Sequence, residues 1–548
     1  MIERGGKSMQ LLMVDTTGTQ SYIFGSNRLR ENIGASHLVA QATRDWALHQ
    51  IRESAPRSNI RDNLNLDNSK QIERDGLDAE VIYTGGGNVL VLFRETLTAQ
   101  SFTRAYSRQL LCEAPGLDVA IEPLEFDPAK DDLAEALAEL QRRLKIQKRS
   151  RTWSAPLLGL GVTRTCQSTG LPAVGFETMG SERKYAVSAD IRAKHRIWEA
   201  ATRRFKTLAD PDPYTYPHEL DDLGRSEGEH SYIAVVHADS NDMGTHIQKL
   251  ITANQENTRE SINALREFSQ DLDDAAEKAL QCLTKTLIDN IMSNQIEHPE
   301  DPDLFVPLAW TSKKKEKCYL PFRPLVVGGD DITFVCDGRL GLSLALLFLR
   351  EFEHSTRNLR DGGVSACAGV AIVKSHYPFA RAYALAEELC ANAKRFRRNN
   401  QIQGSCLDWH YATSGLAGSI NAIREREYKV TSGRLTIKPL ALDAEAGLHT
   451  WLNVQAALQA FQASDAWVGK RNKLKTLREA LRGGSDKVKW FLAKYDGKLP
   501  ELTHGVSPGI MTSGWEDDDC PYFDAIEASD WYIPLEADST QQEANHDD

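Results

Sequence analysis

The order of predicted elements occurs twice along this chain, and such a repeat limits the possible folds more than any single motif does. In the first half the order is strand, helix, strand–turn–strand, helix, strand, at 9–15, 35–51, 79–93, 97–114 and 117–126. The second half repeats the order at 231–239, 265–292, 324–336, 340–357 and 364–373. Both halves therefore predict a β-α-β-β-α-β unit, the ferredoxin-like arrangement.

The predicted class is α+β, with two ferredoxin-like palm domains, an intervening mixed domain and a C-terminal helical domain. Helical apolar spacing in "VQAALQAFQAS" and "KRNKLKTLREALRGG" supports the last of these. The predicted segments are a first palm at 1–126, a mixed α/β region with a linker at 127–230, a second palm at 231–412, a helical domain at 413–534 and a disordered acidic tail at 535–548.

Composition excludes several classes of protein. A formal net charge of −12 argues against binding nucleic acid through bulk positive charge. The sequence has no run of eighteen apolar residues, so no membrane association is expected, and its start lacks the apolar core of a signal peptide. Nine cysteines without a C-x-x-C pair predict neither a zinc site nor a disulfide framework. A cytoplasmic location follows.

The stretch "LVVGGDDITFVC" places two adjacent aspartates, Asp330 and Asp331, between apolar runs. Glycines before them, Gly328 and Gly329, indicate a sharp turn, so the pair lies at a hairpin tip. In a ferredoxin-like unit the first strand ends beside this tip, which brings Asp239 close. Three carboxylates suit Mg²⁺ or Mn²⁺, and two such ions can activate a hydroxyl and neutralise a leaving pyrophosphate. The alternative is an ordinary acidic turn.

Neighbouring residues are candidates for binding a nucleotide. Ser240 and Asn241 follow Asp239 and can face a triphosphate, and the helix "ALAEELCANAKRFRRNN" presents Lys394 and Arg395 to its phosphates. The alternative for the two cations is a solvated basic face at a helix C-terminus, which the helix dipole favours.

The first unit keeps Asp15 at the position of Asp239, but its tip, Gly85-Gly86-Gly87-Asn88, has no carboxylate. One anionic ligand should not hold two divalent ions, so no second catalytic centre is expected. Asp15, Gly86, Gly87 and Asn88 remain candidates for binding a nucleotide, because glycines expose backbone N–H groups to phosphate. The alternative is a hairpin that only braces its partner.

The segments "ADSNDMG", "FRPLVVGGDDITFVCDGR" and "SHYPFARAYALAEELCANAKR" resemble the second palm of the CRISPR polymerase family, the large subunits of type III CRISPR effector complexes. "DTTGTQSYIFGSNRLRENIGAS" and "YTGGGNVLVLF" resemble its first palm. The resemblance implies synthesis of cyclic oligoadenylates from ATP, with Asp239 and Asp330 as metal ligands and Asp331 as a ligand or an aid to deprotonation. It also implies that Lys394 binds phosphate and that two facing palms hold two nucleotides.

The sequence departs from that family in three respects. It has no HD nuclease domain at its start, no cysteine pairs for zinc between the palms, and Ser240 where a glycine is common. A free-standing relative of the effector subunit is therefore expected.

The predicted function is a nucleotidyltransferase that makes cyclic oligonucleotides from ATP, or from GTP. Predicted partners are guide RNA, other CRISPR subunits or a second copy of the chain. Two alternatives stay open: a sensor that binds nucleotides or cyclic oligonucleotides, and an RNA-associated scaffold with an idle palm.

Overall fold

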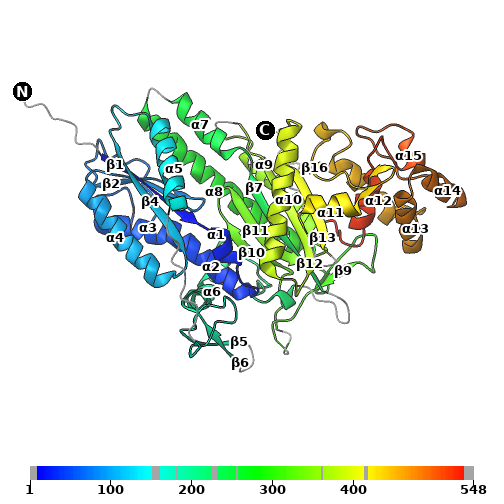
Figure 1. Cartoon of the computed structure of the whole chain (residues 1–548), viewed down its shortest axis with the longest axis horizontal. Coiled ribbons are helices and arrows are strands. Elements are labelled where there is room, and N and C mark those ends of the chain that lie inside the picture. The colour runs from blue at the N-terminus through cyan, green and yellow to red at the C-terminus, as the bar shows by residue number, and fades with distance from the viewer. Residues whose placement is uncertain are drawn as a thin grey trace, which may run out of the picture.

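The computed structural model describes residues 9–150, 161–179, 183–223, 231–254, 257–312, 314, 316–359, 362–412, 418–495 and 497–535. The molecule is elongated, with two β-sheets side by side along its long axis and a group of C-terminal helices at one end (Figure 1). Part of the predicted linker, at 224–230, and the predicted tail from 536 onward lie outside the described residues.

The first sheet has the strand order β2-β3-β1-β4, and all its neighbouring strands are antiparallel. Its strands are β1 (Met9–Thr17), β2 (Ala79–Gly85), β3 (Asn88–Phe93) and β4 (Asp118–Phe126). Successive side chains of a strand point to opposite faces. Leu12 and Val14 therefore enter one apolar core while Leu11 and Met13 enter another. Burial on both faces explains the unbroken apolar run of β1.

Helices cover both faces of this sheet. The first core is closed by α1 (Thr19–Phe24), α2 (Leu29–Ala40), a π-helical turn η1 (Gln41–Trp46), α3 (Ala47–Ser54) and α4 (Thr96–Glu113). The second core is closed by α5 (Leu133–Ser150), whose leucines pack beneath β1 and β4. The predicted charged helix at this position is thus a helix of the first unit.

The second sheet has the order β10-β11-β7-β12-β13-β16 and is mixed, because β12 and β13 run parallel while its other neighbours are antiparallel. Its strands are β7 (Tyr232–Ser240), β10 (Phe322–Val327), β11 (Asp331–Asp337), β12 (Ala366–Lys374), β13 (Cys406–Ala412) and β16 (Leu440–Ala441). The long helix α8 (Thr258–Asp289) and α9 (Gly341–Thr356) cover one face, and α10 (Phe379–Asn399) covers the other (Figure 1).

The two units are joined by helix α8, which packs against β2, the edge strand of the first sheet. An edge strand presents unpaired backbone groups. The buried guanidinium of Arg266 donates to the carbonyls of Val81 (2.9 Å) and Ile82 (3.2 Å), and to the carboxylate of Glu80 (2.9 Å). Arg266 therefore satisfies the strand edge and fixes the second unit against the first.

The elements between the two units in the chain are β5 (Gly175–Met179), β6 (Arg183–Val187), α6 (Ala189–Leu208) and the 3-10 turn η2 (Leu220–Asp222). The second unit also contains α7 (Met243–Ala253), β8 (Gln295–Glu297) and β9 (Phe305–Pro307), which lie between β7 and β10 in the chain. The C-terminal ones are α11 (Ile420–Glu427), β14 (Lys429–Val430), β15 (Gly433–Arg434), η3 (Ala444–Ala446), α12 (Trp451–Ala463), α13 (Arg471–Arg482), α14 (Ser485–Tyr495), α15 (Ile510–Ser513) and α16 (Pro521–Ala528).

The C-terminal helices share one hydrophobic core with the second sheet, through buried rings such as Trp409, Trp451 and Phe523. The predicted α+β class is confirmed, and the predicted order of strands and helices is present in both halves. Within the described ranges, every helix is too short or too polar to cross a membrane.

Candidate active site

The predicted hairpin is formed by β10 and β11, and its tip brings two of the predicted carboxylates together. Asp331 is the first residue of β11 and lies directly opposite Asp239, near the end of β7. The backbone N–H of Ser240 donates to the carbonyl of Asp330 (2.8 Å), and the N–H of Gly328 donates to the carbonyl of Asp331 (2.9 Å). These bonds fix the tip against the strand that carries Asp239.

Close packing explains a glycine at the tip. A Cβ on Gly329 would lie 2.7 Å from Oδ1 of Asp273 on α8, which is closer than carbon and oxygen atoms approach without displacement. Glycine is the residue that permits such a close approach of the backbone.

The tip carboxyl groups hold their protons more tightly than ordinary aspartates. Enclosure by protein atoms, followed by the charges of Asp330 and Asp239, raises the pKa of Asp331 to about 8. Burial and the charge of Asp239 also raise the pKa of Asp330. Atom Oδ1 of Asp331 is buried and has no hydrogen-bond partner in the part of the chain that the structure describes. Since a buried acceptor without a partner is unfavourable, this atom indicates a place for a cation or a donor.

Lys394 faces Asp239 from helix α10. Its ammonium group lies 2.6 Å from Oδ2 of Asp239 and donates to the carbonyl of Ser240 (2.7 Å). In the same way, Arg397 forms an ion pair of 2.5 Å with Asp242, which begins α7 in a left-handed conformation (φ 54°). Two basic side chains of α10 thus hold the loop after β7.

The side chains of this site supply only some of the ligands that a divalent ion needs. Asp239 and Asp331 offer hard carboxylate oxygens from adjacent strands, and Oδ1 of Asp331 has no hydrogen-bond partner among the described residues. No group of three Asp, Glu, His or Cys side chains among the described residues is arranged as a ready-made metal cage. Mg²⁺ is commonly held by one or two carboxylates together with substrate phosphates, so two protein ligands suffice when a nucleotide supplies the others. The predicted three-carboxylate set stays a prediction.

The other predicted nucleotide contacts of the second unit differ in their placement. The side chains of Ser240 and Asn241 are both buried (3% exposed), and Asn241 donates to Oγ of Ser365 (3.1 Å). Arg395 is exposed, donates to Oδ1 of Asn392 (2.8 Å) and lines a cavity on the opposite side of α10 from Lys394. The structure therefore does not bring Arg395 to the carboxylate site.

The tip of the first unit lies against the tip of the second. Gly86 and Gly87 have positive φ (55° and 80°), and a Cβ on Gly86 would lie 3.1 Å from Oδ1 of Asp330. Asn88 lies opposite Asp15 across the sheet, as Asp331 lies opposite Asp239. The four predicted residues of this tip, Asp15, Gly86, Gly87 and Asn88, are thus positioned around the boundary between the units.

Lys148 is a site residue that the sequence reading missed. It lies in α5, and its ammonium group is 2.5 Å from Oδ2 of Asp15 and 3.1 Å from the carbonyl of Thr16. Lys394 makes the same two contacts, to Asp239 and to the carbonyl of the next residue. The signal was available, because α5 follows the last strand of its unit as α10 follows β12, and both helices end in basic residues.

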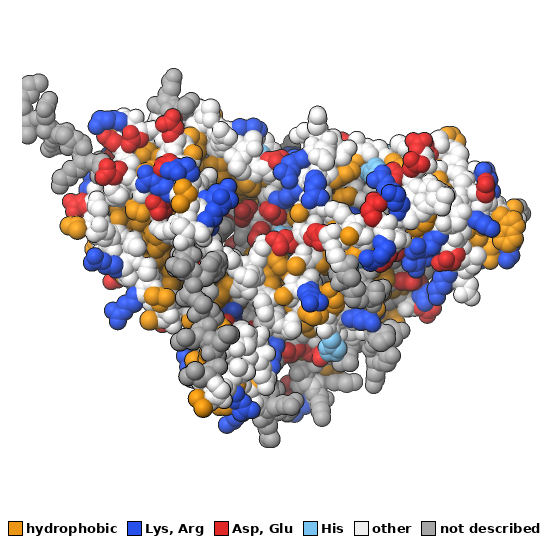
Figure 2. All heavy atoms as spheres, viewed as in Figure 1, with side chains coloured by type: hydrophobic (Ala, Val, Ile, Leu, Met, Phe, Trp, Pro, Cys, Tyr) orange, Lys and Arg blue, Asp and Glu red, His pale blue; other side chains and the backbone are white. Residues whose placement is uncertain are grey.

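Asp273 is a second missed residue. It projects from α8 between the two tips, near Gly329 and Gly85. Burial, together with the charges of Glu277 and Asp330, raises the pKa of Asp273 to about 7, although Arg44 acts in the opposite direction. Acidic side chains gather in a hollow midway along the molecule, where its two halves meet, and Lys and Arg side chains border this hollow (Figure 2). No sequence pattern distinguishes Asp273 from the other acids of a polar helix face.

A carboxylate-bearing hairpin beside a central strand, with a helix covering the sheet, defines the class of palm-domain proteins. Residues 232–403 match the family described as Cas10/Cmr2, second palm domain. Over this segment the chain is similar to the second palm domain of Cas10/Cmr2 proteins.

Solved structures share this fold along nearly the whole chain. Csm1 of T. onnurineus matches with a TM-score of 0.54 and 13% identity, over 96% of this chain and 70% of that one. A Csm1–Csm4 cassette in complex with pppApApA matches with a TM-score of 0.53 and 14% identity, over 96% of this chain and 71% of that one. The apo Csm1–Csm4 cassette matches with a TM-score of 0.53 and 13% identity, over 96% of this chain and 70% of that one. None of the curated proteins compared matches the sequence.

Proposed function

We propose that this protein is a metal-dependent nucleotidyltransferase that joins ATP-derived nucleotides into cyclic oligoadenylates in type III CRISPR signalling. The observation that carries the proposal is the cross-strand pair Asp239–Asp331, with the unpartnered Oδ1 of Asp331 beside it and Lys394 facing it. This arrangement combines ligands for a hard cation with a cation for phosphate.

Both units are, in this proposal, ferredoxin-like palms whose tips face one nucleotide each. The strand orders β2-β3-β1-β4 and β10-β11-β7-β12 support this, since they place the hairpin and the first strand in the same relation in both units. Gly86 lies beside Asp330, so the two tips meet at one boundary, and nucleotides held by both palms would lie next to each other there.

Asp239 and Asp331, with Asp330 beside them, would hold one or two Mg²⁺ or Mn²⁺ ions together with nucleotide phosphates. Such ions neutralise phosphate charge and make a hydroxyl more acidic. To hold the ion, Asp239 would give up its ion pair with Lys394, and Lys394 would then bind the phosphates. Gly328 leaves room for a nucleotide to approach the backbone, since a Cβ there would meet nothing closer than 3.8 Å, while Gly329 keeps the tip packed against α8.

In the proposed reaction the 3′-hydroxyl oxygen of one nucleotide attacks the α-phosphorus of the other. A new oxygen–phosphorus bond forms while the bond from the α-phosphorus to the bridging oxygen breaks, and pyrophosphate leaves. The hydroxyl proton would pass to an ionised carboxylate of the tip that does not hold a metal ion. Catalysis is otherwise positioning and charge neutralisation.

A partner subunit is part of the proposal. The cassette that shares this fold contains Csm4 beside Csm1 and was crystallised with pppApApA, a linear adenylate. We infer that this chain also binds adenine nucleotides and associates with another CRISPR subunit. A guide RNA or a second copy of the chain would regulate it in the same assembly.

The test is incubation of the purified protein with α-labelled ATP or GTP and Mg²⁺ or Mn²⁺, with and without RNA. We expect pyrophosphate and cyclic products, and we expect Asp331→Ala to lower the rate by about 100-fold or more, since such ions contribute several kcal/mol. Asp486→Asn, which changes an exposed carboxylate on α14, is the control and should keep the wild-type rate.

The sensor alternative is favoured by one observation, the absence of a ready-made metal cage among the described residues. If no product forms while ATP binds and Asp330→Ala abolishes that binding, the sensor replaces the enzyme. If ATP does not bind at all, both the nucleotidyltransferase and the nucleotide sensor are excluded.

A further inference from the structure

A cavity of about 310 Å³ lies on the opposite side of α10 from the palm site. It is enclosed by the last turns of α10, by α11 and by the strands that follow it. The lining residues that matter here are Asn392, Arg395, Phe396, Asn399, Asn421 and Lys429. Its volume is at the lower end of the range for small-molecule sites.

The charged lining of this cavity is mostly basic, with Glu425 as the carboxylate among its lining residues. Two of its cations already have buried partners, because Arg424 pairs with Asp408 (2.5 Å) and Lys438 pairs with Asp524 (3.0 Å). Arg395 differs. Its guanidinium donates to the amide oxygen of Asn392, and it forms no ion pair among the residues that the structure describes. It is therefore the cation that an incoming phosphate can engage bidentately.

Asn392 supplies independent evidence for a ligand. Its side chain is 6% exposed, and its Nδ2 group has no hydrogen-bond partner in the described chain, although its oxygen accepts from Arg395. A buried donor without an acceptor costs about 1–3 kcal/mol. A ligand with an acceptor at this position would remove the cost.

The remaining lining suits a planar base. Asn399 and Asn421 bring two further amides to the wall, and Phe396 brings an aromatic ring. Asn amides form paired hydrogen bonds with the edge of adenine, and aromatic rings stack on bases. An inorganic anion could accept hydrogen bonds from these amides but would not use the aromatic ring.

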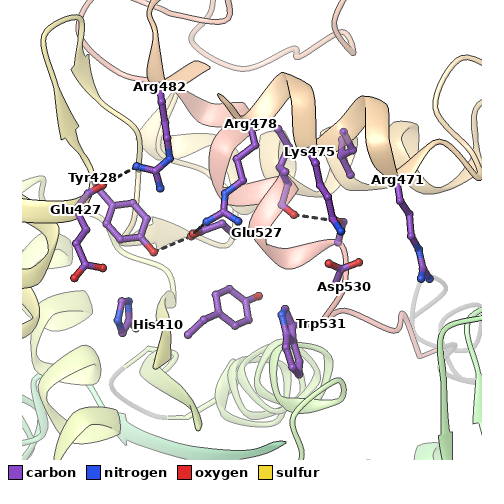
Figure 3. A pocket seen from close by; sticks show the side chains of 14 residues that line it. His410, Glu427, Tyr428, Arg471, Lys475, Arg478, Arg482, Glu527, Asp530 and Trp531 are labelled. Carbon is purple, nitrogen blue, oxygen red and sulfur yellow. Dashed lines mark hydrogen bonds and ion pairs between the residues drawn. The ribbon is translucent and has the colours of Figure 1, made fainter. Parts of the chain in front are cut away.

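A neighbouring cavity has a lining that does not suit a phosphate (Figure 3). It measures about 250 Å³, and Tyr428 lines both cavities. Its arginines lie among carboxylates: Glu527 accepts from Tyr428 (2.9 Å) and pairs with Arg478 (3.3 Å), and Asp530 lies nearby. Glu527 thus neutralises Arg478, and the carboxylates of this lining would repel a phosphate.

We propose that the cavity behind α10 binds a purine nucleotide, with its phosphate at Arg395 and its base against the asparagine amides. This site is separate from the palm and would exist whether or not the palm is catalytic. Because Lys394 and Arg395 are adjacent residues in one turn of α10, a nucleotide here would also fix the turn that presents Lys394 to Asp239.

The test is equilibrium binding of adenosine monophosphate to the full chain in EDTA, which removes any binding that depends on metal at the palm. We expect one bound molecule per chain. Arg395→Ala should weaken binding about tenfold or more, because a hydrogen bond to a charged group contributes about 1.5–3 kcal/mol. Asn392→Leu should also weaken it. Arg381→Ala, which removes an exposed arginine near the start of α10, should not.

Several outcomes overturn the proposal. One is the absence of binding, and another is binding that Arg395→Ala leaves unchanged; Arg395 is exposed, so its loss should not unfold the chain. Equal affinity for ribose 5-phosphate or inorganic phosphate would exclude the contact to the base. Loss of binding in the double variant Asp330→Ala, Asp331→Ala would place the nucleotide in the palm. Failure of ATP turnover, in contrast, leaves this proposal standing.

Discussion

Asp331 stays protonated at a pH where an ordinary aspartate is ionised, because it is enclosed by protein and faces two other carboxylates. A raised pKa of this kind is common at functional sites, where groups are positioned for a ligand at the expense of stability. Asp330 and Asp273 share the direction of the shift for the same two reasons. The acids of this site are thus arranged for a positive charge, which Lys394 supplies at Asp239.

This arrangement predicts a pH-dependent effect of Asp331→Asn on stability. In the unfolded chain the carboxyl group ionises near pH 4, while in the folded chain it ionises near pH 8. The contribution of Asp331 to the free energy of unfolding is therefore most favourable below pH 4, and it is lost as pH rises toward 8. In EDTA, the variant should gain stability relative to the wild type between pH 5 and pH 8.5, as measured by urea unfolding at each pH. A difference that does not change with pH would contradict the prediction.

At the scale of the element, the tip hairpin functions because glycine lets it pass between α8 and the tip of the first unit. Gly329 approaches Asp273, and Gly86 approaches Asp330. The hairpin is thus held from both sides, and its carboxylates cannot move without displacing a neighbour.

We predict that Gly329→Ala displaces the tip. The added methyl group would lie 2.7 Å from Oδ1 and 3.2 Å from the backbone N of Asp273. Under the proposed function, ATP turnover should fall about tenfold or more, since a misplacement of about 1 Å can cost 100-fold. Gly244→Ala is the matched control, because nothing lies within 4 Å of its added methyl group. Equal turnover by both variants would show that the tip position does not matter.

Much of each element could be predicted from the sequence. Alternating and continuous apolar runs reveal β1, β7 and both hairpins, and the opposition of Asp239 and Asp331 follows from the order of the strands. The direction of side chains on α10 could not be predicted, because Lys394 and Arg395 are adjacent and only packing decides which one faces the sheet. Asp273 and the contact between the tips depend on how two units pack, which no local pattern encodes.

At the scale of the whole molecule, the two units form one body through α8. Arg266 crosses from α8 to β2 and is 2% exposed, and its partner Glu80 is fully buried. Breaking a buried pair by removing one partner leaves the other charge without compensation.

Arg266→Met should therefore destabilise the molecule by about 3–5 kcal/mol, the range for a broken buried ion pair. Arg259, which also contacts Glu80, should retain part of the interaction. The measurement is urea unfolding at neutral pH, with Lys278→Met, an exposed change on the same helix, as the control. Equal midpoints for the two variants would mean that the contact between α8 and β2 contributes little.

In the structure without ligands, the ammonium group of Lys394 is the counterion of the Asp239 carboxylate. Under the proposed function, magnesium alone would have to displace a tethered ammonium group, and a nucleotide alone would meet carboxylates that repel it. With both present, Asp239 would hold the metal and Lys394 would be released to bind the phosphates, so that each charge would keep a partner. Substrate and metal are thus expected to enter as one neutralising unit, and the site discriminates against either of them in isolation.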